Sequence, residues 1–413
     1  MQVLVVTHYF PPEIGAPQAR LSELAAHWVQ GGCDVTVLTA MPNHPTGVVP
    51  PEYRGAWRRD ERIDGYRVVR TWLYATPNVG VVKKTLGHLS FMITSVILGL
   101  SRVGHPDVVV VSSPTFFSIL SAWLIARVKR ARLIIEVRDL WPAIFVELGV
   151  LKNRVVIRAL EAVELAAYRS SDAVVVVTEG FQRNIVDRGI DPSKVHTIRN
   201  GVDLSLFSPD LRVDPDMREW LCAGPEQVLV LYIGAHGISH GLHSVVEAAA
   251  CLADEPVHLA LVGEGAEKRE LEEEVNERGL TNVTMHPGVS REQVPSILAA
   301  ADICLVPLKD VPLFRTFIPS KIFEYLASGK AVVGAVRGEP AEILSEAGAV
   351  VVRPEAVEDL VRAIMHLAND PERRAEMGRR GRRYVEEHFD RRQLAADYLD
   401  ILKAAVHEHT ALQ

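Results

Sequence analysis

The sequence lacks the short motifs that mark several large enzyme classes. It has no GxxxxGK(S/T), HExxH or GxSxG pattern, which argues against P-loop NTPases, zinc proteases and α/β-hydrolases. Its four cysteines are scattered without a CxxC pair, so we expect no zinc site, no disulfide framework and a reducing, cytoplasmic setting. No apolar run reaches about 18 residues and no signal-peptide pattern opens the chain, so we expect neither a membrane-spanning helix nor a signal peptide.

Composition and charge are those of a globular protein with an uneven charge distribution. The chain has 413 residues, 48% hydrophobic and 23% charged, which suggests two or three domains. Residues 1–200 carry 23 Lys and Arg against 17 Asp and Glu, a net +6, which leaves −13 for the remainder. The positive half favours an anionic partner such as phosphate or a lipid headgroup, with chance sampling of surface charge as the alternative. The acidic second half, without interleaved aromatic and basic residues, argues against nucleic-acid binding.

Strands alternate with helices throughout, which predicts α/β architecture with parallel sheets. A strand at 3–7, an amphipathic helix and a strand at 34–39 form a βαβ unit of Rossmann type. The stretch 41–80 is less regular and holds one short strand, 66–71. Further strands are predicted at 107–112, 133–137, 173–178, 195–198, 228–234, 258–262, 283–285, 303–306, 331–333 and 350–352.

The turn-rich stretch NGVDLSLFSPD, which starts at Asn200, marks a domain boundary. We assign residues 1–203 to a first domain and 204–387 to a second. The C-terminal helix, about 388–413, is expected to pack back on the first domain.

Two apolar helices are predicted in the first domain, at 88–100 and 116–130. Both are too short to span a membrane, and both could be buried against the sheet. Because Lys83, Lys84 and Arg102 flank the first helix, contact with a membrane surface is an equal alternative there. For the second helix we favour burial.

The segment FRTFIPSKIFEYLASGKAVVGAVRGEPAE contains the main candidate site. Pro319 suits the first turn of a helix that Gly329 would end. The free N–H groups around Ser320, the helix dipole and the Lys321 ammonium together favour an anion. Glu324 lies one turn later on the same face, so the pair could hold a diphosphate and a ribose hydroxyl. Alternatively, Lys321 and Glu324 form a surface ion pair.

Two glycine-rich turns follow strands of the second domain. They are GAHGISHG (Gly234–Gly241) and GEG (Gly263–Gly265), and both should lie at the edge formed by the carboxyl ends of the strands. His236 and His240 in the first turn could donate to phosphate oxygens, or could be structural.

Strand ends of the first domain supply a second group of candidates. The loop after the first strand has Gly15, which would allow a close backbone approach, although the GxGxxG spacing is missing. Arg20 lies in the following helical turn and should face the crevice or solvent. Ser113 and Arg138-Asp139 follow later strands. Arg138 and Asp139 could form a salt bridge that holds their loop, or a clamp for an acceptor phosphate.

These motifs in combination resemble one family. They are HYFPPEIGAPQAR, RDLWP, NGVD with Phe207 after it, LVGEG, and PSKIFEYLASGK followed by Glu342. From end to end the chain resembles the retaining, nucleotide-sugar-dependent glycosyltransferases of family four. This implies the GT-B fold, with two facing Rossmann-like domains, parallel sheets and an interdomain cleft. The chain is most similar to transferases that extend undecaprenyl-diphosphate-linked sugars in surface polysaccharide assembly, such as N-acetyl-L-fucosamine transferases of O-antigen clusters.

The resemblance implies roles for individual residues. Glu324 matches the second glutamate of the family's E-x7-E motif, which binds the donor ribose, and the N–H groups around Pro319–Lys321 match those that hold the donor diphosphate. Gly234 and Gly241 match the phosphate loop, and Gly15 the acceptor-side loop. The candidates are Gly234, His240, Gly241, Gly263, Gly265, Pro319, Ser320, Lys321 and Glu324 for donor binding, His236, Lys321 and Glu324 for catalysis, and Gly15, Arg20, Ser113, Arg138 and Asp139 for acceptor binding.

The chain departs from the family pattern in the donor site. Thr316 replaces the first glutamate of E-x7-E, and Ala235 and His240 replace the Arg and Lys that flank the phosphate loop. We predict that Lys321, with His236 and His240, supplies the missing positive charge, which would make phosphate binding sensitive to pH.

The implied activity is that of a hexosyltransferase. Its donor would be a UDP-linked sugar, and its acceptor a lipid-linked or other glycan at the inner face of the cytoplasmic membrane, where the enzyme would be peripheral. A helix terminus and cations stabilise a departing diphosphate, so we expect no metal and no other cofactor. Without a convincing nucleophilic carboxylate, same-face attack with retention is expected. The alternatives are a GT-B UDP-sugar 2-epimerase and a non-catalytic nucleotide-sugar-binding protein.

Overall fold

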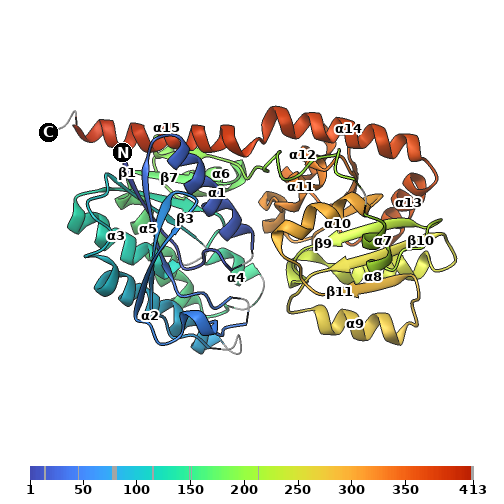
Figure 1. The fold of residues 1–413 in the computed structure, drawn as a ribbon, viewed down its shortest axis with the longest axis horizontal. Coiled ribbons are helices and arrows are strands. Elements are labelled where there is room, and N and C mark those ends of the chain that lie inside the picture. The colour runs from blue at the N-terminus through green and yellow to red at the C-terminus, as the bar shows by residue number, and fades with distance from the viewer. Residues whose placement is uncertain are drawn as a thin grey trace. The chain divides into compact units, whose positions relative to one another are not determined.

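The computed structural model describes residues 1–13, 15–44, 46–76, 81–113, 116–147, 149, 151–212 and 214–410. The chain forms two compact units (Figure 1). Unit 1 comprises Met1–Arg199 and Arg392–Gln413, and unit 2 comprises Asn200–Arg391. The unit boundaries therefore fall within a few residues of positions 203 and 387.

Unit 1 is built on an eight-stranded sheet with the order β3-β4-β2-β1-β5-β6-β7-β8. Neighbouring strands are parallel except for β3 and β4. The aliphatic run of β5 is buried throughout, as in parallel sheets that helices cover on both faces. The strands are β1 (Gln2–Val6), β2 (Asp34–Ala40), β3 (Arg58–Ile63), β4 (Tyr66–Thr71), β5 (Val108–Ser112), β6 (Arg132–Val137), β7 (Ala173–Val176) and β8 (Val195–Thr197).

Strand β3 is missing from the strands that the sequence predicts. Its residues, RRDERI, are mostly exposed and show no apolar alternation. It pairs antiparallel with β4 at the sheet edge, where Arg70 Nε donates to Glu61 Oε2 at 2.8 Å. Charged side chains on an edge strand prevent it from pairing with other chains. Because such a strand lacks hydrophobic periodicity, sequence patterns do not predict it.

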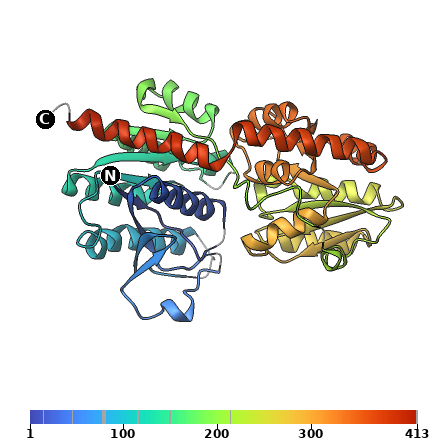
Figure 2. The same ribbon diagram turned by 45° about the horizontal axis from the view of Figure 1, so that its top comes forward.

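The last helix of the chain belongs to unit 1. Trp28 of α1 donates from Nε1 to the carbonyl of Ala395 at 3.1 Å, and its ring meets Tyr398 edge-on at 5.3 Å. Both Figure 1 and Figure 2 show α15 lying along unit 1. The helices of unit 1 are α1 (Ala16–Gln30), α2 (Val81–Gly99), α3 (Phe116–Lys129), α4 (Ala143–Glu147), α5 (Arg154–Ser170), α6 (Glu179–Asp187) and α15 (Arg391–Thr410).

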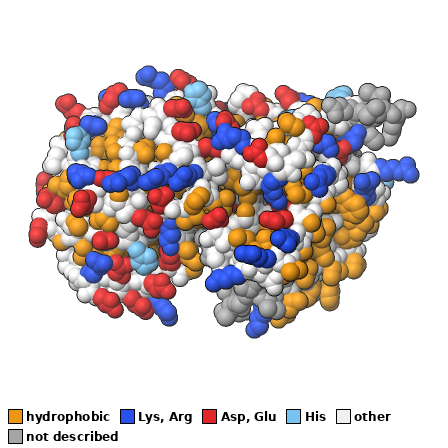
Figure 3. Space-filling view, turned by 180° about the vertical axis from the view of Figure 1, so that it is seen from behind, with side chains coloured by type: hydrophobic (Ala, Val, Ile, Leu, Met, Phe, Trp, Pro, Cys, Tyr) orange, Lys and Arg blue, Asp and Glu red, His pale blue; other side chains and the backbone are white. Residues whose placement is uncertain are grey.

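Helices α2 and α3 pack against each other and expose apolar side chains on their outer faces. The predicted burial of α3 is wrong for its outer face, because only the inner residues, such as Ile119 and Ala122, are buried. Figure 3 shows hydrophobic side chains gathered over this part of unit 1. No helix in the described part of the chain has the length and hydropathy needed to cross a bilayer. The exposed apolar residues are Leu86, Ile93 and Ile97 on α2, and Leu120, Trp123, Leu124 and Val128 on α3.

Unit 2 is built on a six-stranded parallel sheet with the order β11-β10-β9-β12-β13-β14. The two parallel sheets confirm the predicted α/β class. The strands are β9 (Val228–Ile233), β10 (Val257–Val262), β11 (Val283–His286), β12 (Ile303–Pro307), β13 (Ala331–Ala335) and β14 (Val350–Val352). The helices are α7 (Pro215–Trp220), α8 (Leu242–Cys251), α9 (Lys268–Glu277), α10 (Val294–Ala300), α11 (Lys321–Ala327), α12 (Glu339–Glu346), α13 (Val357–Ala368) and α14 (Pro371–His388).

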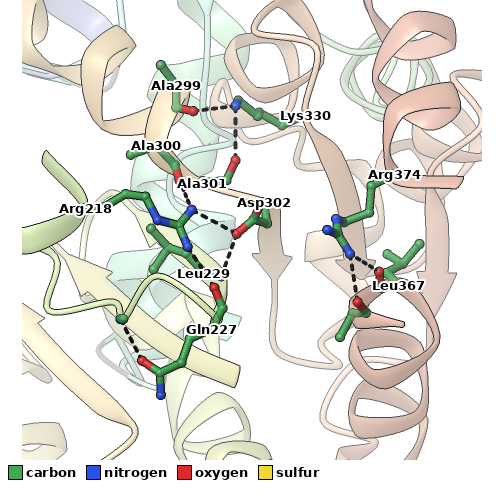
Figure 4. Close-up of polar contacts among 12 residues, drawn as sticks. Arg218, Gln227, Leu229, Ala299, Ala300, Ala301, Asp302, Lys330, Leu367 and Arg374 are labelled. Carbon is green, nitrogen blue, oxygen red and sulfur yellow. Dashed lines mark hydrogen bonds and ion pairs between the residues drawn. The ribbon is translucent and has the colours of Figure 1, made fainter. Parts of the chain in front are cut away.

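Polar contacts fix the amino ends of the central strands of unit 2 (Figure 4). Asp302, just before β12, accepts from the backbone N–H of Leu229 at 2.8 Å and from Arg218 Nη1 at 3.1 Å. Lys330, just before β13, donates to the carbonyls of Ala299 and Ala301 at 2.7 and 3.1 Å. These side chains therefore have structural roles. The candidate site residues lie at the opposite ends of the strands, the carboxyl ends.

Candidate functional site

Two glycine-rich loops of unit 2 interlock at the carboxyl ends of β9 and β10. The N–H of Gly234 donates to Val262 O at 2.9 Å. A Cβ on Gly263 would stand 1.8 Å from Gly234 O, and a Cβ on Gly265 would stand 2.2 Å from His236 O. No side chain fits at such distances, so glycine is required at both positions. Gly241, at the end of the first loop, has a left-handed φ of 58°.

The side chain of Lys321 reaches into the first loop. Its Nζ lies 3.6 Å from the centroid of the Tyr232 ring, and 2.6 Å from where a Cβ on Gly234 would stand. This ammonium is buried and has no hydrogen-bond partner in the part of the chain that the structure describes. Burial lowers the pKa of Lys321 to about 7, an effect that the charge of Glu324 opposes. An unpaired buried amine beside two close-packed glycine loops suits an anionic ligand.

His236 and His240 lie next to the same tyrosine ring, with centroid distances of 5.9 and 6.0 Å from Tyr232. Burial, with Lys268 and Lys321, lowers the pKa of His236 to about 4. Burial and Lys321 hold the pKa of His240 well below its usual value. Both imidazoles are therefore neutral at pH 7. Of the three predicted cations, Lys321 is therefore the one that can carry the positive charge. The ring N–H of His240 is hydrogen-bonded to the carbonyl of Pro307, whereas the ring nitrogens of His236 have no partner within the described residues, so His236 keeps an N–H for a ligand.

Helix α11 begins at Lys321 and not at Pro319 as predicted. The carbonyl of Pro319 accepts from the N–H of Ile322, and that of Ser320 from the N–H of Phe323, both at 3.1 Å. Within the described residues, the N–H groups of Ser320 and Lys321 make no backbone hydrogen bond. The predicted backbone donors are therefore present, although the helix behind them is only seven residues long.

Glu324 is paired with a residue that the sequence analysis missed. Arg291 Nη1 lies 3.3 Å from Glu324 Oε1, and its guanidinium lies 5.7 Å from the ring centroid of Phe207. The alternative of a Lys321–Glu324 surface pair is wrong, because Lys321 is buried and has no hydrogen-bond partner among the described residues. Arg291 could have been noticed, since it closely follows β11 on the same sheet edge.

Other cations near the loops are neutralised by glutamates. Lys309 Nζ lies 3.3 Å from Glu267 Oε1, and Lys268 Nζ lies 2.8 Å from Glu264 Oε1. Lys309 follows β12, and its backbone N–H donates to Ser239 O at 3.0 Å in the first loop. It too was missed, although it obeys the same strand-end rule.

In unit 1, Arg20 does not face a crevice or solvent as predicted. It is 1% exposed, and its Nε lies 2.9 Å from Glu136 Oε1. Its two Nη groups donate to the carbonyls of Ile198 and Arg199, both at 3.0 Å. Because the whole guanidinium is engaged in structural contacts, we correct its predicted acceptor-binding role to a structural one.

Arg138 lies beside this pair at the end of β6. It is buried, and its Nε and Nη1 have no hydrogen-bond partner within the described residues. Ser113 Oγ accepts from the Arg138 backbone N–H at 2.9 Å. No ion pair joins Arg138 to Asp139 in the described part of the chain, and burial raises the pKa of Asp139 although Arg138 opposes this. The salt-bridge alternative is therefore not observed, and the two free donors suit an anion.

Gly15 precedes α1 with a φ of 164°, an extended conformation that any residue adopts. A Cβ there would meet only the end of the flexible Gln18 side chain. The close backbone approach predicted for Gly15 is thus not required by the structure. An imidazole and phenol cluster near the same loop was missed: the ring of His8 lies 4.4 Å from that of His88 and 4.5 Å from that of Tyr9.

The described residues contain no group of three or more His, Cys, Asp or Glu side chains that could hold a metal ion.

Comparison with known proteins identifies both units. Residues 15–201 match the glycosyl transferase 4-like domain, and residues 217–384 match the glycosyl transferases group 1 domain. The chain is 28% identical to WcaI of Escherichia coli K12, a putative colanic acid biosynthesis glycosyl transferase, over 98% of this chain and all of that protein. A sucrose-phosphate synthase from Thermosynechococcus elongatus has a TM-score of 0.75 at 19% identity, covering 98% of this chain and 99% of the other. Anabaena HepE in complex with UDP and glucose has a TM-score of 0.74 at 15% identity, covering 98% and 100%.

The two units have the GT-B fold, as the likeness to the sucrose-phosphate synthase shows, and the domains that they match are those of glycosyltransferases. The two matched domains together account for most of the chain, so the protein is a glycosyltransferase that combines a glycosyl transferase 4-like domain with a glycosyl transferases group 1 domain.

Proposed function

We propose that this glycosyltransferase moves a sugar from a UDP-linked donor, with retention of configuration, to a lipid-linked or other glycan acceptor in cell-surface polysaccharide biosynthesis. The observation that carries the proposal is the unpaired Lys321 ammonium, buried against two glycine loops. A fixed cation and fixed N–H groups stabilise negative charge as it develops on a departing diphosphate. The assignment of WcaI to colanic acid biosynthesis supports a polysaccharide product, and the UDP bound by HepE supports the choice of base.

The residues of unit 2 receive these roles. Lys321 and the N–H groups of Ser320 and its neighbours hold the diphosphate. Neutral His236 donates its N–H to the same phosphates, and His240, whose N–H donates to the Pro307 carbonyl, lies beside them in the loop. Glu324 exchanges its partner Arg291 for a ribose hydroxyl. In this proposal protein groups hold the diphosphate, and we assign no step to a metal or another cofactor.

The residues of unit 1 serve the acceptor. The two unpartnered donors of Arg138 suit the phosphates of a lipid diphosphate, with Ser113 fixing the loop and Asp139 and Gly15 beside the acceptor sugar. A lipid-linked acceptor places the enzyme at the inner face of the cytoplasmic membrane as a peripheral protein. The exposed apolar residues of α2 support this location.

Incubation of the purified protein with radiolabelled UDP- and GDP-sugars tests the proposal. We expect label to enter the organic phase only when lipid extract is present, and from a UDP-sugar. The proton coupling constants of the product should show that the transferred sugar keeps the anomeric configuration that it has in the donor. Interconversion of UDP-sugars without acceptor would instead establish the 2-epimerase, and transfer only from GDP-sugars would contradict the assigned base.

Donor binding should depend on pH through Lys321. A diphosphate favours the ammonium form, so binding raises a pKa that is about 7 in the free protein. Above that pKa the free amine must take up a proton, so affinity for UDP should fall as the pH rises from 7, and level off below 7. Calorimetry at about pH 8 in buffers of different ionisation enthalpy should detect uptake approaching one proton. Uptake that persists unchanged in Lys321→Met would contradict the assignment.

A further inference from the structure

Unit 1 contains a cavity of about 370 Å³ where α3 ends and β6 begins. It lies at the amino end of β6, whereas Ser113 and Arg138 follow the carboxyl ends of β5 and β6. The cavity is therefore separate from the candidate acceptor site. Its lining includes Trp123, Arg127, Arg130, Arg132, Ser170 and Asp172.

The cavity carries more positive than negative charge. Arg132 forms an ion pair with Asp172, yet its Nε is buried and has no hydrogen-bond partner within the described residues. The guanidinium of Arg127 lies 5.6 Å from the ring centroid of Trp123. Neither Arg127 nor exposed Arg130 has a carboxylate partner among the residues that the structure describes. Three guanidinium groups against one carboxylate leave donors for a phosphate.

The cavity opens at one end of a large apolar surface. Leu120, Trp123, Leu124 and Val128 of α3 follow helical spacing and form one exposed stripe, which the exposed residues of α2 extend (Figure 3). Such a contiguous apolar surface on a globular protein marks an interaction site. We call the seven exposed apolar residues of α2 and α3 the α2–α3 face.

Positive charge at both ends of the α2–α3 face indicates which kind of partner binds it. Exposed Lys83 and Lys84 lie at the start of α2, at the strand carboxyl ends, and Arg127 and Arg130 lie at the other end. From Leu120 to Val128 the stripe on α3 is about 12 Å long, at a helical rise of 1.5 Å per residue. An apolar strip bordered by cations, with a tryptophan near its edge, fits the headgroup and acyl boundary of an anionic bilayer.

We propose that the cavity binds the phosphate headgroup of an anionic phospholipid while the α2–α3 face lies on the bilayer. The inference deepens the proposed function, which requires a membrane for the lipid-linked acceptor. In this arrangement α3 begins close to Ser113, on the proposed acceptor edge, and its apolar stripe ends at the cavity. The headgroup contact would hold the far end of the helix on the membrane and keep the acceptor edge at its surface.

Sedimentation with vesicles tests the proposal on the full chain. The protein should bind vesicles of phosphatidylcholine with phosphatidylglycerol, and should not bind phosphatidylcholine alone. Each lost cation should weaken binding about fivefold, so Arg127→Glu with Arg130→Glu should weaken it at least about 25-fold. The conservative Arg127→Lys with Arg130→Lys should keep most of the binding. A matched control, Arg269→Glu with Arg379→Glu, makes the same charge change at side chains of unit 2 that are 84% and 66% exposed, and should bind like the wild type.

Several results would overturn the proposal. Equal binding of both vesicle types, or an equal loss in the control, would show that the cavity does not select a headgroup. Competition by inorganic phosphate at the concentration of lipid phosphate would identify a soluble-phosphate site. Dimerisation that the cavity variant abolishes, without vesicle binding by the wild type, would identify an interface between two copies of the chain. UDP affinity without lipid, and transfer to an acceptor in detergent, should be unchanged in the cavity variant, which separates this inference from the proposed function.

Discussion

Replacing Lys321 with alanine should weaken UDP binding about 10- to 100-fold, because hydrogen bonds from a charged donor contribute about 1.5–3 kcal/mol each. Turnover should fall further, by about 100-fold or more, if the ammonium also stabilises the departing diphosphate. Calorimetric titration with UDP and initial rates of sugar transfer measure the two effects. The reason for so large an effect is that other cations beside the loops, Lys268 and Lys309, already have glutamate partners.

Two variants make this prediction specific. Lys268→Ala removes one positive charge from the same region, but that charge is paired with Glu264, so UDP affinity should change by no more than a few-fold. Lys321→Met keeps the stem against Tyr232 and removes a buried amine that lacks a hydrogen-bond partner in the described structure. It should therefore lose UDP binding without lowering the unfolding temperature. Unchanged UDP affinity in Lys321→Ala would remove the basis of the proposed donor site.

The second large effect is expected from Glu136→Ala, which should destabilise unit 1 by about 3–5 kcal/mol because it leaves a buried guanidinium without its carboxylate. Glu136 is fully buried and accepts from Arg20 Nε at 2.9 Å and from Ser112 Oγ at 2.7 Å. Burial alone would raise the pKa of Glu136, but Arg20, Arg138 and Ser112 outweigh it, and the net pKa is lowered. Urea unfolding followed by circular dichroism measures the loss.

Matched variants separate the ion pair from general disruption. Glu52→Ala removes an exposed carboxylate from the same unit and should change stability by less than about 0.5 kcal/mol. Arg20→Leu alone should be as harmful as Glu136→Ala. The double change Arg20→Leu with Glu136→Leu should recover much of the loss, since neither charge is then buried alone. Strict additivity of the two single effects would show that the two side chains do not act as a pair.

The strand pattern and most candidate residues of unit 2 followed from the sequence. Parallel strands buried on both faces are continuous aliphatic runs, which pattern analysis detects directly. Their carboxyl ends share one edge, so Gly234, Gly263 and Lys321 could be placed near one another before any contact was known. The interlocking of the loops could not be predicted, because it depends on how closely two backbones approach.

What the sequence alone determined was therefore the order of the buried strands, the α/β class, and the strand edge at which the candidate residues lie, because these depend on local periodicity and on glycine and proline. The tertiary structure alone decided which charges are buried and with whom they pair. It placed Arg20 in an internal ion pair, joined Glu324 to Arg291, and exposed one face of α3. Such outcomes depend on side chains distant in sequence, and no local pattern records them. The cavity at the end of α3 is also decided by the tertiary structure, because the residues that line it come from α3, α5 and two strand starts and meet only after folding.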